Sequence, residues 1–255
     1  MSPAQIRFLT LVRRETTRFW KIKRQTLGAP LLETFLYISV FGAALGSRID
    51  KLHGVDYVVF IIPGLIMMAW ATNAFSNNSS SLLQQKFQRS IDDQLSSPAS
   101  PAELLLAFSA GGFVRGGIVA VSTFVAARIL VDIPLEHLEV LIPSLFLVGF
   151  FFSQLGVLVG LRAEQFDDVS FYQTFILTPL IFLGGVFYSA ALLPEPFRTL
   201  TKFDPVYYMI GLVRYGFLGY SEQSIPFSLL FLTVAAAGLF AINYRLFARG
   251  YRLRA

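Results

Sequence analysis

Charged residues within apolar stretches are the first places where this sequence can do chemistry. Arg115 lies about midway along the apolar run 101–130, and Glu33 follows Pro30 by three residues in another apolar run. A charge at membrane depth costs free energy and needs a partner or water. Glu33 can reach a nearby surface, whereas Arg115 needs an acceptor on another helix. We expect structural roles for both, with a wet pathway that attracts an anionic headgroup as the alternative for Arg115.

Amide and aromatic side chains at helical spacing form a second group of candidates. Asn73 and Asn77 share one helical face, where they can hydrogen-bond a neighbouring helix or line a polar path. The aromatic stripes can serve packing or form a ligand surface. The residues alone leave both alternatives open for a group that consists of Tyr37, Phe41, Asn73, Asn77, Phe175, Thr178 and Phe182.

A polar segment at 83–96 is compatible with a short helix. Phe87, Ile91 and Leu95 recur at i, i+4 and i+8 and form one thin apolar stripe. A helix of this kind can dock into a groove on a partner or rest on the bilayer surface, and the residues favour neither. The candidate contact residues are Phe87, Arg89, Ile91, Asp92, Asp93 and Leu95.

Several kinds of site are excluded. There is no cysteine, which rules out disulfides and thiolate chemistry, and the two histidines, His53 and His137, form no metal-binding pattern. No G-x-x-x-x-G-K-[ST] loop is present to hold the phosphates of ATP. The net charge of +5 arises from basic residues at the chain ends and between apolar blocks, so it indicates topology and not nucleic-acid binding. We expect no catalytic residue, no metal and no cofactor on this chain.

The elements that position these residues are predicted to be membrane-spanning helices. Of 255 residues, 55% are hydrophobic and 15% are charged, and the mean hydropathy is +0.60, whereas soluble domains carry about 25% charge. The apolar residues form blocks of about twenty, the length that crosses a 30 Å hydrocarbon core. We predict a single all-α membrane domain over 1–255 with six transmembrane helices, at about 29–47, 57–79, 101–130, 139–161, 170–190 and 226–247.

Two further segments are predicted to lie at the membrane surfaces. Residues 4–25 form an amphipathic helix with a basic face, typical of an interfacial helix. Residues 191–225 are apolar but broken by proline and glycine, which indicates an outer hairpin of two short helices, the second capped by Asp204 with Pro205 in its first turn. Within 170–190, Thr178-Pro179 predicts a kink.

The positive charges orient the helices. With the N-terminus inside, 14 of the 21 Lys and Arg residues fall on the inner side and five on the outer side. This bias places both termini in the cytoplasm. Glycines spaced four apart predict close helix packing within the bundle, at Gly42/Gly46, Gly112/Gly116 and Gly156/Gly160.

Motifs distributed along the chain carry a family resemblance. They are FIIPGLIMM at 60–68, KFQR at 86–89, LTPL at 177–180, LGGVFYS at 183–189, DP at 204–205 and RYGFLG at 214–219. In this order they resemble the ABC-2 type permeases, closely the YadH-like branch, over essentially the whole chain.

The resemblance implies a membrane permease subunit of a bacterial inner-membrane exporter. Such permeases dimerise, and each copy docks one ATPase subunit, so that two ATPase copies supply ATP and Mg. The N-terminal helix and the helix at 83–96 would contact the ATPase, and the substrate path would run between protomers near spans 1, 2 and 5. Family substrates include lipid-linked saccharides, drugs and other amphiphiles. A stand-alone channel or secondary transporter is the alternative, although we find no internal repeat of the kind common in secondary transporters.

Overall fold

The computed structural model describes residues 2–20, 23–44 and 51–253. The described residues are helical except for loops and one antiparallel bridge between Leu52 and Val55. Four helices are long and apolar enough to cross a membrane: α3 (Tyr57–Phe87), α5 (Pro101–Leu130), α6 (Leu138–Arg162) and α11 (Ile225–Ala248). A shorter apolar stretch, Thr26–Gly42, lies within α2 (Lys23–Ala44). The chain is therefore a multi-span membrane protein.

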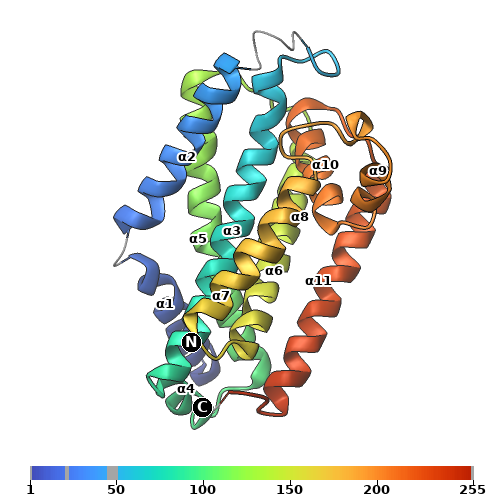
Figure 1. Ribbon diagram of the computed structural model, residues 1–255. Coiled ribbons are helices and arrows are strands. Elements are labelled where there is room, and N and C mark those ends of the chain that lie inside the picture. Colours follow the sequence, from blue (N-terminus) through green and yellow to red (C-terminus); the bar gives the residue numbers. More distant parts are fainter. Residues whose placement is uncertain (1, 21–22, 45–50, 254–255) are drawn as a thin grey trace.

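Shorter helices cover both ends of this bundle. Figure 1 shows α9 and α10 at one end and α4 at the other, with α1 and the residues after α11 on the α4 side. The bounds of these helices are α1 Pro3–Trp20, α4 Ser90–Leu95, α7 Phe166–Tyr172, the π-helical η1 Gln173–Leu177, α8 Thr178–Leu183, the 3₁₀ turn η2 Ala190–Leu192, α9 Phe197–Thr201 and α10 Pro205–Leu218.

Helix α3 forms the centre of the molecule because glycines on two neighbours let it approach closely. A Cβ built on Gly112 of α5 would lie 2.6 Å from Asn78, and one on Gly156 of α6 would lie 2.4 Å from the Phe75 carbonyl oxygen. Gly116 and Gly160 meet α3 in the same way. Two of the predicted glycine pairs therefore pack against α3, while Gly46 of the third lies outside the described residues.

Local signals in the sequence explain several helix ends. Ser100 and Glu103 form a capping box at the start of α5. At the start of α10, the predicted cap Asp204 accepts a hydrogen bond from the Val206 N–H. At the end of α6, the ammonium group of Lys86 donates to the carbonyl oxygens of Gly160, Leu161 and Ala163 at 2.8–3.2 Å. A buried cation thereby satisfies a helix C-terminus and ties α3 to α6. The carbonyls it satisfies could not be identified from the sequence.

The structure corrects the single helix expected at 83–96. Helix α3 continues through Phe87, and α4 begins only at Ser90. Arg89 stands between them in a left-handed conformation with φ of +54°, which ends one helix and starts another in a new direction. The stripe of Phe87, Ile91 and Leu95 is therefore divided between two helices and does not form one face.

The helix expected at 170–190 also differs from the prediction. It begins earlier, at Phe166, and ends at Leu183, after which Gly185 has a φ of +91°. The predicted irregularity at Thr178-Pro179 takes the form of η1, a π-helical turn in which the Thr178 hydroxyl donates to the Gln173 carbonyl at 3.0 Å. Proline has no N–H to offer the preceding turn, so the hydrogen-bond ladder widens there.

Candidate functional site

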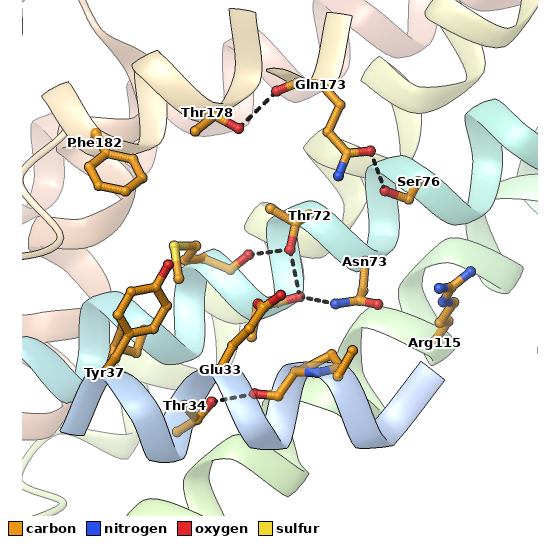
Figure 2. A pocket seen from close by; sticks show the side chains of 15 residues that line it. Glu33, Thr34, Tyr37, Thr72, Asn73, Ser76, Arg115, Gln173, Thr178 and Phe182 are labelled. Carbon is orange, nitrogen blue, oxygen red and sulfur yellow. Dashed lines mark hydrogen bonds between the residues drawn. The ribbon is translucent and has the colours of Figure 1, made fainter. Parts of the chain in front are cut away.

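A polar cavity of about 370 Å³ lies between α2, α3, α5 and the η1–α8 segment. Thr178 and Phe182 line it and are also exposed, so the cavity meets the surface of the chain beside α8. Figure 2 shows its aromatic side chains, Tyr37 and Phe182, at one end and Arg115 at the other. A ligand with an apolar part and a polar or charged part matches this division. The complete lining is Ala29, Pro30, Glu33, Thr34, Tyr37, Leu65, Met68, Ala69, Thr72, Asn73, Ser76, Arg115, Gln173, Thr178 and Phe182.

Four of the seven path candidates from the sequence line this cavity: Tyr37, Asn73, Thr178 and Phe182. The other three lie elsewhere. Phe41 stacks on Phe187 with ring centroids 4.8 Å apart, Asn77 is fully buried, and Phe175 is 67% exposed and stacks on Phe171.

The polar wall of the cavity comes mainly from α3. Thr72 and Asn73 donate hydrogen bonds to carbonyls of their own helix, at Met68 and Ala69. Ser76 donates to the Gln173 side chain at 2.9 Å and so connects α3 to η1 (Figure 2). Sequence reasoning missed Thr72, Ser76 and Gln173. Their polarity inside apolar runs was a signal for the first two, but only the π-helical turn explains why Gln173 faces α3.

An aromatic cluster surrounds the end of the cavity opposite Arg115. Tyr37 and Phe182 contact Phe187 with ring centroids 5.3 Å apart in each case, and Phe41 packs on the same ring. Phe187 belongs to the segment just after α8 and is 8% exposed. Phe41 therefore contributes to this end of the cavity indirectly, through Phe187.

Arg115 occupies an unusual position, at the junction of two cavities. It lines the first cavity and also a second one, of about 490 Å³, between α1 and α3. The hydrogen bond expected from Arg115 to another helix is not formed with any described residue, and its Nε is buried without a partner. Glu33 is exposed on α2 and lines only the first cavity.

The α4 end of the molecule contains the expected partner-contact residues. Phe87 and Phe166 are 55% and 51% exposed and stack with centroids 5.6 Å apart and planes 8° apart. Arg89 and Asp93 are exposed, and Asp92 and Leu95 are half-buried.

Ile91, by contrast, is 1% exposed and packs in a cluster of the chain's own residues that includes Leu104, Phe108 and Phe247. It is therefore not available as a surface contact, because α4 turns its apolar side inward against α5, α6 and α11.

Hydrogen bonds join α1 to this end of the bundle. The buried carboxylate of Glu15 accepts from the Ser81 hydroxyl at 2.6 Å and from the Gln85 amide at 2.8 Å. Gln85 in turn accepts a hydrogen bond from Gln94 of α4. Arg7 forms an ion pair with Glu103 at 2.7 Å. Helix α1 is thus hydrogen-bonded to α3 and α4 and ion-paired with α5.

At the opposite end, Arg214 of α10 is buried. Its guanidinium lies 3.8 Å from the centroid of the Phe60 ring and donates to the Gly185 carbonyl at 2.8 Å. His53 hydrogen-bonds Ser189 and Tyr220 on the same side. These contacts hold the segment after α8 in place and give a structural reason for Arg214 in the RYGFLG motif.

The comparisons with known proteins agree with this architecture. Residues 6–218 match the family model described as "ABC-2 type transporter". The chain is 39% identical over 241 residues to "Inner membrane transport permease YadH" of Escherichia coli (strain K12), covering 94% of both chains. It is 26% identical over 216 residues to "Nodulation protein J" of Rhizobium leguminosarum bv. trifolii, covering 84% of this chain and 82% of the relative.

Proposed function

Because this chain belongs to the ABC-2 type transporter family, as an inner-membrane permease subunit, we propose that it exports an amphiphile. In this proposal, two copies enclose the substrate path, and two copies of a separate ATPase subunit, which bind ATP and Mg, drive transport.

The cavity between α2, α3, α5 and α8 is the observation that carries the proposal. Its volume of about 370 Å³ lies at the lower end of the range for ligand sites, about 300–1,000 Å³. The cavity meets the surface beside α8, where Phe175 is exposed, and α2 exposes Leu32, Phe35 and Leu36. A second copy packed on this apolar face would cover it and join two cavities into one path. The aromatic and cationic ends of each cavity suit an amphiphile such as a lipid, a drug or a lipid-linked saccharide.

The six proposed membrane spans are α2, α3, α5, α6, the α7–η1–α8 helix and α11. Helix α1 then lies at the cytoplasmic interface, and α9 and α10 lie at the outer interface. Helix α3 has 31 residues and is about 46 Å long, so its last turns project beyond a 30 Å core toward α4.

This topology predicts the location of reporters. A fusion at Ala255 is expected to be cytoplasmic and an insertion at Ser221 to be external, because basic residues are retained on the inner side. Paired reporters, one active only in the cytoplasm and one only outside, provide the measurement. Export of the Ala255 fusion would contradict the six-span arrangement.

The Phe87–Phe166 pair, with Arg89 and Asp93, is the proposed contact for the ATPase. Exposed aromatic side chains are frequent anchors of protein interfaces, and truncating an anchor often costs 2 kcal/mol or more. We expect Phe87→Ala and Phe166→Ala each to weaken binding of the ATPase by about tenfold or more. Co-purification and substrate-stimulated ATP hydrolysis, measured on the purified permease–ATPase complex, report the effect.

Phe203→Ala is the matched control, because Phe203 is 79% exposed but lies between α9 and α10, at the opposite end of the bundle. Its ATPase binding should equal that of the unchanged protein. Transport in proteoliposomes that lack any ATPase would instead support the channel or secondary transporter. Full ATPase coupling in both phenylalanine variants would show that the contact lies elsewhere.

A further inference from the structure

The second cavity, between α1 and α3, has an unusual charge. It has a volume of about 490 Å³ and is lined by Arg14, Thr17, Arg18, Phe19, Ser80, Gln84, Gln85, Gln88 and Arg115. Three of these nine residues are arginines and none carries a carboxylate. The cavity therefore concentrates positive charge at the α4 end of the molecule, where α1 lies against the bundle.

The nearby acidic residues, Glu15 and Glu103, do not line the cavity and are bonded to other side chains. The Glu15 carboxylate accepts hydrogen bonds from Ser81 and Gln85, and Glu103 pairs with Arg7. The sequence that follows α1, Lys21-Ile22-Lys23-Arg24-Gln25, adds three basic residues and no acid. Arg18 and Arg115 also repel one another electrostatically. Glu15 attracts Arg18 electrostatically, but one carboxylate against three arginines still leaves the cavity with a net positive charge.

The guanidinium groups are only partly bonded to protein. Arg18 donates to the Asn77 carbonyl at 2.7 Å and to the side chains of Asn77 and Gln84, but its Nε is buried without a partner. The Nε of Arg115 is also buried without a partner. Among the described residues, Arg14 donates only to the Ser90 hydroxyl, at 3.3 Å. The terminal nitrogens of Arg115 form no hydrogen bond with a described residue and are not among the buried atoms, so they keep donors for a bound anion.

We propose that this cavity binds the phosphate group of an anionic amphiphile from the cytoplasmic leaflet. Three planar guanidinium forks, together with the amide groups of Gln84 and Gln88, suit a tetrahedral anion with several oxygens. A single carboxylate offers two oxygens and would leave most of these donors unused.

The position of the arginines gives the site a direction. Arg14 is exposed at the mouth, Arg18 follows one helical turn later and is half-buried, and Arg115 lies where the second cavity meets the first. A phosphate that moves from Arg14 to Arg115 brings its lipid chains toward the aromatic end of the first cavity. The choice of the cytoplasmic leaflet and this second step rest on the proposed function, whereas binding of the phosphate does not.

Binding can be measured on the full chain purified in a neutral detergent, without ATPase. Dihexanoyl phosphatidic acid is the probe, dihexanoyl phosphatidylcholine is the zwitterionic comparison, and calorimetric titration gives the affinities. We expect the phosphatidic acid to bind and the phosphatidylcholine not to bind. Arg18→Gln and Arg115→Gln should each weaken binding of the phosphatidic acid by about tenfold or more.

Arg13→Gln is the matched control, because Arg13 is exposed on the same helix and does not line the cavity. It should bind like the unchanged protein. If Arg115→Gln does not yield folded protein, the affinities of Arg18→Gln and Arg115→Lys are compared with that of the unchanged protein. The lysine keeps the positive charge but loses the planar guanidinium group. If inorganic phosphate competes at concentrations similar to those of the phosphatidic acid, free phosphate is an accepted ligand. If it does not compete, the ligand is the lipid headgroup.

Equal affinities in the unchanged protein and in Arg18→Gln would overturn the inference, as would equal binding of the two lipids. Since no ATPase is present in the titration, such a result together with normal co-purification of the ATPase would leave the proposed function intact. If the unchanged protein does not co-purify with the ATPase, that result would instead count against the proposed function alone.

Discussion

Gly156→Ala is expected to destabilise the whole helix bundle. The added Cβ would lie 2.4 Å from the Phe75 carbonyl oxygen and 3.1 Å from the Asn78 Cβ, so α3 and α6 must move apart. Overpacking of this kind costs about 3 kcal/mol, whereas replacing a helical glycine with alanine gains at most about 1 kcal/mol. The net loss of about 2 kcal/mol should lower the Tm in detergent by roughly 4–8 °C.

Gly238→Ala provides the control for this prediction. Gly238 lies in α11, another apolar helix, and nothing is within 4 Å of its added Cβ. The same chemical change should therefore leave the Tm unchanged or raise it slightly. Equal Tm values for the two variants would show that α3 and α6 are not in close contact at Gly156.

Ile91→Asp is expected to reduce the amount of folded protein sharply. Ile91 is 1% exposed and lies in the cluster with Leu104 and Phe108, so the variant loses apolar burial and places a carboxylate among hydrocarbon side chains. The lost burial alone costs about 1.5–3 kcal/mol, and the buried charge adds several more. Size-exclusion chromatography of a fluorescent fusion in detergent measures the folded fraction. The docking hypothesis from the sequence predicts the opposite, normal yield with lost ATPase coupling.

Phe87→Asp tests the same stripe on its exposed side. The Phe87 ring is 55% exposed and contacts Phe166, so a carboxylate there remains in water and the fold should persist. We expect normal yield and reduced ATPase binding. A normal yield of Ile91→Asp would mean that α4 leaves its position in the structure and presents Ile91 to a partner.

The sequence by itself predicted a helical multi-span membrane protein, because this property depends on short stretches of chain. Twenty apolar residues match the thickness of a hydrocarbon core wherever they occur. The helix caps also depend on short stretches of chain. The Ser100–Glu103 capping box joins residues three positions apart, and the Asp204 cap joins residues two positions apart.

Only the tertiary structure decided what each helical face contacts. Spacing placed Phe87, Ile91 and Leu95 on one stripe, but the left-handed Arg89 divides it, and Ile91 packs inside the chain while Phe87 is exposed. In the same way, the helix around Pro179 was expected to bend, but the π-helical turn that directs Gln173 toward Ser76 depends on packing against α3.

Arg115 illustrates the difference most clearly. The sequence showed that this charge needs an explanation, and it left a structural tie and a wet pathway as alternatives. The residues that share its cavity, Arg14 and Arg18, are about 100 positions earlier in the chain and belong to a helix outside the apolar runs. No periodicity connects residues so far apart. Their meeting depends on how α1 docks against α3 and α5, because electrostatic and packing interactions act through space and not along the chain.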